Sequence, residues 1–201
     1  MCGICGFNWR DKNFLNKILA EIKHRGPDSF GFYEDDKISL GHRRLSIVDL
    51  TKSGSQPMSN EDGKIWIIFN GEIYNFKELR SDLESKGHRF KSNTDTEVLI
   101  HLYEEYDLKF LEKINGMFAF CIYDSSKKIF FLARDRIGIK PVYYYEDHGR
   151  FIFCSEIKGI LKHPEIKRQI NPSAIDSFLT FRANISEETC FKGIKKIMPL
   201  K

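Results

Sequence analysis

The hydrophobic residues of this chain change period along the sequence, and the order of these changes indicates the fold class. Residues 65–69 form a continuous apolar run of strand length, which is expected to be buried on both faces. Four strand-like runs between 117 and 155 are separated only by polar turns, which predicts a meander with antiparallel pairing. The predicted strands are 3–9, 30–33, 37–40, 65–69, 117–123, 129–134, 142–145 and 151–155.

Stretches at helical spacing lie between these strands. Apolar residues recur with a helical period over 14–22. Asn75 with Glu78, and Thr94 with Glu97, have the spacing of a capping box and predict the starts of two more helices. A short helix over 155–161 and a last one from Asn171-Pro172 to Phe181 complete the prediction. Strand runs separated by helix runs are typical of α+β layering, with helices outside antiparallel sheets.

Size and charge exclude several classes of protein. The 201 residues correspond to one domain with a short extension, at roughly 150 residues per domain. The formal net charge is only +4 and the charges are interspersed, so no nucleic-acid partner is expected. No apolar run approaches the roughly 20 residues of a membrane helix, and no signal peptide precedes the body of the chain. These features predict a soluble, cytoplasmic protein without a membrane partner.

The five cysteines support a reducing compartment, because their number is odd and three lie in or beside apolar runs. Cys2 and Cys5 alone have the spacing of half a zinc or redox site. A closed zinc site needs four ligands, and neither the other cysteines nor the six histidines supply a second close pair. We therefore predict no metal ligands, and a zinc or redox module remains only as an alternative function.

The position of Cys2 is the most informative feature for function. When the residue after Met1 is small, Met1 is normally removed, which would leave a cysteine with a free α-amine. An α-amine titrates near 7.7–8.0 and a thiol near 8.5, so the neutral amine can accept the thiol proton. An N-terminal amine that activates its own side-chain nucleophile is an established mode of catalysis. A chain that keeps Met1 is expected to be inactive.

Five segments carry a family resemblance: Met1–Gly6, His24–Asp28, Arg44–Asp49, Phe69–Asn75 and Ala133–Pro141. In order and separation they resemble the class II glutamine amidotransferases, and most of all the N-terminal glutaminase domain of glutamine-hydrolysing asparagine synthetases. The resemblance spans residue 2 to about residue 197. It implies the N-terminal-nucleophile hydrolase fold, a four-layer αββα sandwich of two antiparallel sheets, in agreement with the α+β layering.

The resemblance also implies an enzyme that hydrolyses L-glutamine to glutamate and ammonia through a thioester on Cys2. It places oxyanion stabilisation on the Asn70 side chain and the Gly71 backbone N–H, and losing one such donor typically costs about 2.7–4 kcal/mol. From the residues alone, Asn70-Gly71 is also a strong hairpin signal. Both interpretations can hold, because a turn at a strand end would present these groups to a substrate.

For the other end of glutamine, the resemblance implies Arg44 as the ligand of the α-carboxylate, which a guanidinium can bind bidentately. Spacing alone leaves open whether Arg43 or Arg44 points inward. Asp95, with Glu72 as a second acceptor, is implied for the α-ammonium. An Asp at a helix start is more often a cap, but the better capping residue here is Thr94, which leaves Asp95 free. The backbone expected to line the same pocket is that of Leu45, Ser46, Ile47 and Val48.

Two more segments receive lesser roles. The resemblance places His24–Asp28 near the glutamine site, with Arg25 acting behind the residues that touch substrate. Asp135–Pro141 lacks the spacing of a phosphate-binding loop and is interpreted as a structural loop.

The resemblance further implies a larger enzyme. Residues 2–190 would form the glutaminase domain, and 191–201 the start of a linker to a C-terminal synthetase domain of the same chain. In the resembled enzymes that domain amidates aspartate to asparagine with ATP and magnesium, whereas no cofactor is expected in the glutaminase domain. Another ammonia acceptor remains an alternative, and a homodimer is a further partner left open.

Overall fold

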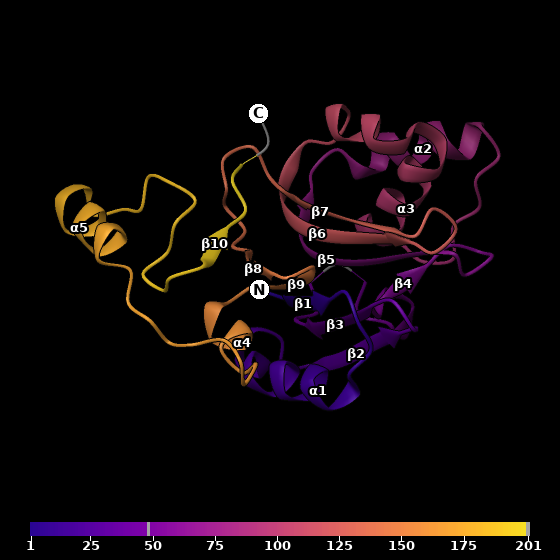
Figure 1. Cartoon of the computed structure of the whole chain (residues 1–201). Helices are drawn as coiled ribbons and strands as arrows, with labels where there is room; N and C mark the ends of the chain where they lie inside the picture. The colour runs from indigo at the N-terminus through magenta and orange to yellow at the C-terminus, as the bar shows by residue number, and fades with distance from the viewer. Residues whose placement is uncertain (48, 200–201) are drawn as a thin grey trace.

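Two antiparallel sheets form the centre of the structure, a computed structural model that describes residues 1–47 and 49–199 (Figure 1). One sheet contains β1 Gly3–Phe7, β2 Ser29–Glu34, β3 Ser39–Arg44, β8 Tyr143–Asp147, β9 Arg150–Cys154 and β10 Ile194–Lys196. The other contains β4 Met58–Ser59, β5 Ile65–Ile73, β6 Gly116–Asp124 and β7 Ile129–Arg134. Their strand orders are β10-β8-β9-β1-β3-β2 and β4-β5-β6-β7.

Helices cover the outer faces of both sheets. The helix α1 Lys12–Glu21 and the short α4 Ile157–Ile160 pack on the six-stranded sheet, while α2 Phe76–Ser85 and α3 Asp95–Tyr106 pack on the four-stranded sheet (Figure 1). The remaining helical segments are η1 Lys23–Arg25, η2 Lys52–Gly54, η3 Asp107–Glu112 and α5 Pro172–Phe181. The layers therefore follow one another as α, β, β and α, which confirms the predicted αββα sandwich.

Three apolar clusters correspond to the three spaces between these layers. The strand β5 contributes to two of them because its side chains alternate between faces. Ile67 and Phe69 pack with the helices α2 and α3, whereas Ile68 packs between the sheets. The prediction that residues 65–69 are buried on both faces is confirmed.

The last four strands pair antiparallel as predicted, but the prediction of one continuous meander is wrong. The strands β6 and β7 pair in the four-stranded sheet, whereas β8 and β9 pair in the other. The buried carboxylate of Asp135 accepts hydrogen bonds from the backbone N–H groups of Phe118, Ile139 and Lys140 at 2.9–3.2 Å. These bonds hold the segment after β7 in a turn that carries the chain from one sheet to the other.

The capping predictions have different outcomes. The side chain of Thr94 accepts the N–H of Glu97 at 3.3 Å, as predicted. The carboxylate of Glu97 instead accepts the N–H groups of Lys91 and Ser92, so the reciprocal half of the box is absent. Asn75 precedes α2 but its side chain caps nothing. It binds the backbone of Lys113 and Asn115 at 2.9 Å and so joins two distant segments.

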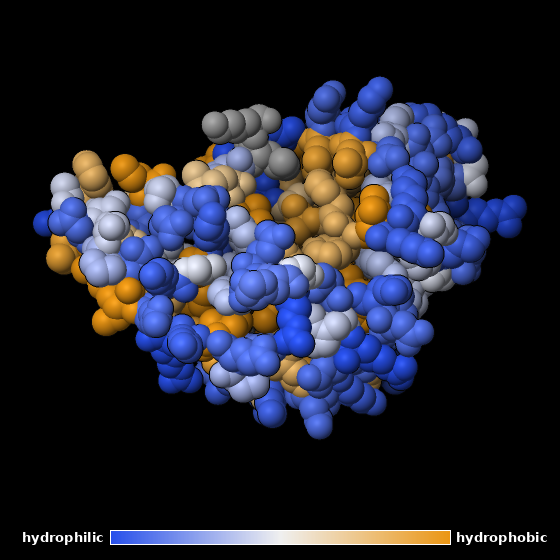
Figure 2. All heavy atoms as spheres, viewed as in Figure 1, coloured by the Kyte–Doolittle hydropathy of each residue, from blue (hydrophilic) through white to orange (hydrophobic). Residues whose placement is uncertain are grey.

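The C-terminal part of the described chain, expected to begin a linker, contains one strand. Residues 194–196 form β10, which pairs with β8 in the six-stranded sheet. The helix α5 lies away from the two stacked sheets, and Figure 2 shows apolar side chains exposed at this end of the molecule. They include Phe178, Leu179 and Phe181. Among the described residues, none of the helices has both the length and the apolar character needed to cross a membrane.

Candidate functional site

A pocket opens where the two sheets meet the start of α3. Of the residues that the sequence analysis selected, those that line it are Cys2, Arg44, Leu45, Ile47, Asn70, Gly71, Glu72 and Asp95. Cys2 directly precedes β1, Arg44 ends β3, residues 70–72 lie in β5, and Asp95 begins α3. The fold therefore brings together candidates that are far apart in sequence.

The thiol of Cys2 is held by the backbone of Leu45. Its Sγ atom accepts the Leu45 N–H at 3.3 Å and lies 3.5 Å from the Leu45 carbonyl oxygen. Burial raises the pKa of the Cys2 thiol, although the Leu45 hydrogen bond and the charges of the N-terminus, Arg44 and Arg25 act in the opposite direction. A thiol in this state needs a nearby base to become a nucleophile.

Arg25 lies behind Cys2, where the sequence analysis expected it. Its Nε donates to the Cys2 carbonyl oxygen at 2.9 Å, and its Nη1 pairs with Glu156 at 3.0 Å. His24 contacts the same Glu156 oxygen at 2.8 Å. The guanidinium thus orients the backbone of Cys2 while remaining on the far side of that residue from the pocket, which it does not line.

Arg44 is buried and points into the pocket, whereas its neighbour Arg43 points away. Nη1 of Arg44 donates to the Thr51 carbonyl at 2.8 Å, and Nη2 donates to the Asp49 carbonyl. Arg43 instead donates to Leu19 at 2.8 Å. Adjacent residues in a strand face opposite sides of a sheet, so only one of the two arginines can serve this pocket.

Asn70 and Gly71 lie within β5, opposite Ala119 and Phe118, so the prediction of a turn at these residues is wrong. A glycine is required there because a Cβ at residue 71 would overlap the Met117 carbonyl oxygen of β6. Asn70 is 2% exposed, and its Nδ2 has no hydrogen-bond partner among the described residues. The pocket therefore contains a buried amide donor that is free to bind a ligand.

Asp95 and Glu72 place two carboxylates in the same pocket. Oδ2 of Asp95 accepts the N–H of Ile73 at 3.0 Å, while capping of α3 falls to Thr94. Burial raises the pKa of Asp95 to about 6, and the nearby charge of Glu72 adds to this rise against the backbone hydrogen bonds. A cationic ligand group between these carboxylates would favour the ionised form of Asp95.

Two predicted lining residues are not found in the pocket. Ser46 is half-buried but does not line the pocket, and its N–H donates to Asp28 at 2.8 Å. Val48 lies outside the described residues. The sequence analysis in turn missed several residues that line the pocket: Gly54, Gln56, Thr96, Met117 and Lys140. Gly54 and Gln56 lie in the loop after β3, Thr96 in α3, Met117 in β6 and Lys140 in the loop after β7, so only the tertiary structure brings them beside Cys2.

Cys2 and Cys5 do not form a common site. Cys5 is fully buried in the cluster beneath α1, and its Sγ lies 3.7 Å from the Gly41 carbonyl oxygen. All five cysteines are free. Within the part of the chain that the structure describes, neither cysteine belongs to a group of three metal-binding side chains. The zinc or redox alternative gains no support from this geometry.

Comparisons with known proteins agree with the pocket. The sequence model of the glutamine amidotransferase domain family matches residues 1–201. The chain is 37% identical over 210 residues to glutamine-hydrolysing asparagine synthetase 3 of Bacillus subtilis (strain 168), covering 99% of this chain and 34% of that protein. It is 49% identical over 179 residues to asparagine synthetase 2 of the same strain, covering 85% of this chain and 24% of that protein. The chain thus spans about a third or less of the length of these curated relatives.

A solved structure is similar in fold. Glutamine phosphoribosylpyrophosphate amidotransferase from B. subtilis superimposes with a TM-score of 0.68 at 22% identity, over 79% of this chain and 43% of that one. At this level of identity the likeness concerns the fold alone.

Proposed function

This chain belongs to the glutamine amidotransferase domain family, and from that premise we propose that it hydrolyses L-glutamine to glutamate and ammonia with Cys2 as the nucleophile. The pocket supports this proposal because it offers one group for each part of the substrate. A thiol faces the amide carbon, a guanidinium suits the α-carboxylate, and two carboxylates suit the α-ammonium.

The single observation that carries the proposal is the unpartnered Nδ2 of Asn70 in the same pocket as the Cys2 thiol. A buried donor without a partner costs about 1–3 kcal/mol, so its presence calls for a ligand acceptor. The oxyanion that forms when a thiolate attacks an amide is such an acceptor. We assign oxyanion stabilisation to Asn70 Nδ2–H and the Gly71 backbone N–H.

The proposed reaction begins when the α-amine of Cys2 takes the thiol proton and the thiolate attacks the side-chain amide carbon of glutamine. The tetrahedral oxyanion collapses, the amine returns the proton to the leaving nitrogen, and ammonia departs. Water then hydrolyses the γ-glutamyl thioester and releases glutamate. Met1 lines the pocket in this structure, so the active species is the chain from which Met1 has been removed.

Substrate binding falls to residues on both sides of Cys2. We assign the α-carboxylate to Arg44 and the α-ammonium to Asp95 with Glu72. Leu45 and Ile47 line the pocket beside the nucleophile, and the backbone from Leu45 to Val48 would complete this wall. Ser46 contributes through its place in this segment, because its side chain does not line the pocket.

The ammonia that the glutaminase releases would be used by a second domain of a larger protein. The two curated relatives are named asparagine synthetases and are about three or four times as long as this match. We propose that residues 2–190 form the glutaminase domain and that residues 191–201 begin the linker to a C-terminal synthetase domain. That domain would use ATP and magnesium to convert aspartate to asparagine in the cytoplasm, where free cysteines persist. An ammonia acceptor other than aspartate remains an alternative. A second copy of the chain, in a homodimer, is a further proposed partner.

The test combines intact mass with glutamate release. The chain is expressed without an N-terminal tag, removal of Met1 is checked by mass, and glutamine hydrolysis is measured beside Cys2→Ala and Cys190→Ala. We expect hydrolysis by the processed wild type and by Cys190→Ala, which removes a half-buried thiol elsewhere, and none by Cys2→Ala. Wild-type turnover in Cys2→Ala would overturn the assignment of the nucleophile.

If the processed chain is inert, the same assay is repeated on the full-length protein. Activity of the full-length protein that is lost in Cys2→Ala would retain the nucleophile and show that the site needs a second domain. Inactivity of both would overturn the proposed function.

A further inference from the structure

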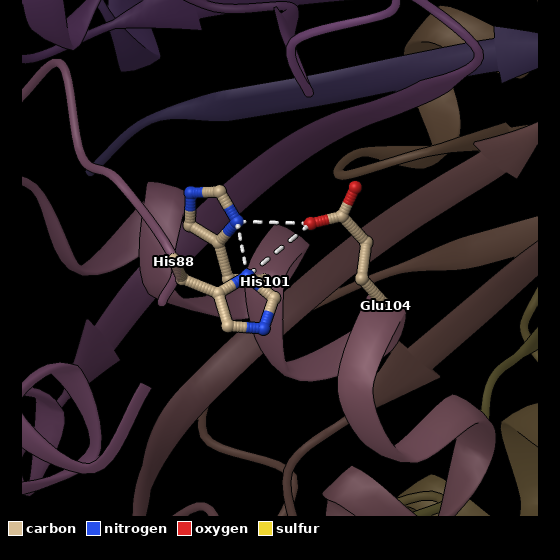
Figure 3. A group of neighbouring side chains, drawn as sticks. All are labelled: His88, His101 and Glu104. Atoms are coloured by element: carbon tan, nitrogen blue, oxygen red, sulfur yellow. Dashed lines mark hydrogen bonds and ion pairs between the residues drawn. The ribbon is translucent and has the colours of Figure 1, made fainter. Parts of the chain in front are cut away.

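A second cluster of titratable side chains lies outside the glutamine pocket, between the end of α2 and the middle of α3. His88 follows α2, and His101 and Glu104 lie one turn apart on α3. Figure 3 shows both imidazole rings and the Glu104 carboxylate turned toward one shared point. Of the described residues, only these three form a group able to hold a metal ion, with ligand atoms within 4.8 Å of one another.

The distances among the three ligand atoms match those around a tetrahedral ion. Nδ1 of His88 lies 3.2 Å from Nδ1 of His101, which lies 2.9 Å from Oε2 of Glu104. The third distance, from His88 Nδ1 to Glu104 Oε2, is 3.8 Å. Bonds of about 2.0–2.1 Å to a tetrahedral zinc ion separate neighbouring ligand atoms by about 3.3–3.4 Å. The three observed distances lie around that value.

The opposite ring nitrogens face carboxylates. Nε2 of His88 lies 3.4 Å from Glu105, and Nε2 of His101 lies 3.9 Å from both Glu61 and Glu97. The hydrogen bond of His88 Nε2 to Glu105 favours the tautomer that carries its proton there, as is common for histidines that bind metal. Nε2 of His101 has no hydrogen-bond partner among the described residues, and the negative charges of Glu61 and Glu97 favour a proton there as well. Both Nδ1 lone pairs then point at the shared point together with a carboxylate oxygen.

Three electron-rich atoms that converge in this way need a proton or a metal ion between them. His101 is 2% exposed, so bulk water cannot screen the repulsion at its ring. The carboxylates that surround the two rings, those of Glu61, Glu97, Glu104 and Glu105, favour a cation at the shared point.

We propose that His88 Nδ1, His101 Nδ1 and Glu104 Oε2 bind one zinc ion, with water as the fourth ligand. Imidazole and carboxylate are ordinary zinc ligands, and three of them with an open position give the usual four-coordinate geometry. The sequence analysis predicted no metal ligand because His88 and His101 are 13 residues apart without finger spacing. The ion ties the segment after α2 to α3 and does not depend on the glutamine site.

The test is a zinc titration of the whole chain by isothermal calorimetry, in the Cys2→Ala background so that the half-buried Cys2 thiol does not compete. We expect one zinc per chain. His88→Gln and Glu104→Gln each remove one ligand from a partly exposed side chain. Each should weaken zinc binding at least about tenfold, because the loss of a residue that only hydrogen-bonds to a ligand already lowers metal affinity by about tenfold. His148→Gln is the matched control, because its side chain is 94% exposed and distant from the cluster.

Thermal melts of each variant without zinc establish that the fold is retained. Cobalt provides a second readout, since a four-coordinate site gives visible absorption that His88→Gln should abolish. The proposal is overturned if the chain binds no zinc, or if His88→Gln and Glu104→Gln bind it as tightly as His148→Gln. In that case the cluster holds a proton only.

Discussion

Gly54 lies so close to the guanidinium of Arg44 that a Cβ at residue 54 would overlap Nη2 and lie 3.0 Å from Cζ. The same guanidinium donates to the carbonyl groups of Asp49 and Thr51. The loop that follows β3 therefore fixes the direction of Arg44 from three sides. Because the remaining N–H groups of Arg44 are assigned to the substrate carboxylate, this loop controls binding without touching the reacting atoms.

Gly54→Ala should weaken glutamine binding while leaving the fold intact. The obstructing atoms are at the far end of a flexible side chain, so Arg44 can shift at little cost in stability. Loss of a hydrogen bond to a charged group costs about 1.5–3 kcal/mol, so KM should rise about tenfold to a hundredfold. The change in kcat should be smaller, because ground-state and transition-state binding are lost together. Steady-state kinetics beside the exposed Ser53→Ala check this, and an unchanged KM would contradict it.

Gly71→Ala should lower the stability of the fold, because the two nearest atoms that an added Cβ would meet belong to the backbone of β6. The added Cβ would overlap the Met117 carbonyl oxygen and lie 2.8 Å from Cα of Phe118, both in β6. Neither atom can move without separating β5 from β6. Overpacking of this kind costs about 1–3 kcal/mol, and each kcal/mol lowers Tm by about 2–4 °C in a chain of this size. The Tm of both variants is measured by thermal melting. If Gly71→Ala has the same Tm as Gly54→Ala, the strands accommodate the methyl group and the prediction is wrong.

Arg25→Met should lower kcat more than it changes KM. The Arg25 guanidinium holds the Cys2 carbonyl at 2.9 Å and does not line the pocket, so its removal loosens the nucleophile and leaves the binding groups in place. Loss of a charge-assisted hydrogen bond costs about 1.5–3 kcal/mol, so kcat should fall about tenfold to a hundredfold. His24→Gln is the matched control, since it removes another partner of Glu156 but keeps Arg25. A rise in KM at constant kcat would refute this positioning role.

Asp95 should make glutamine binding dependent on pH. Its pKa is raised to about 6, first by burial and then by Glu72, so the carboxylate becomes protonated as the pH falls below that value. Only the ionised form attracts the α-ammonium, and KM should therefore rise about tenfold for each pH unit below about 6. Measurements from pH 5 to 8 on wild type and Asp95→Asn check this. Asp95→Asn should have a high KM that does not change with pH. If KM of the variant depends on pH as that of wild type does, Asp95 is not the group that titrates.

The same group should cost stability at neutral pH. A folded-state pKa above the unfolded value of about 3.9 means that the folded protein favours the protonated acid, so stability is lost as the pH rises from about 4 to 6. A rise of about two pKa units corresponds to at most about 3 kcal/mol. Asp95→Asn should therefore unfold at higher urea concentration than wild type at pH 7, and the difference should shrink at pH 4. A variant less stable at pH 7 would contradict the burial argument.

Local pattern was sufficient for most elements of the fold. The period of the apolar residues predicted β5, β6, β7 and the helix α3, because strand and helix place side chains on one face at different intervals. It failed where a side chain makes a distant contact. Asn75 has the sequence of a cap but binds Lys113 and Asn115, and Asp135 turns the expected meander from one sheet into the other.

For the site, the family resemblance located residues within the matching segments and one at the start of α3. It selected Cys2, Asn70 and Asp95, which the fold brings into one pocket. Gly54 and Gln56 were missed because they lie in the loop after β3, outside any pattern. The cluster of His88, His101 and Glu104 was missed for the same reason, since its geometry exists only when α2 packs beside α3.

The sequence alone determined most of the elements, their α+β layering and the placement of a cysteine at the position where an α-amine can activate it. These depend on residues that are close along the chain, whose spacing is visible in one dimension. The tertiary structure decided which strands share a sheet, that Arg44 rather than Arg43 faces the pocket, and that Asn70 keeps a buried donor free. These depend on contacts between distant residues, which form only when the two sheets stack and water is excluded from between them.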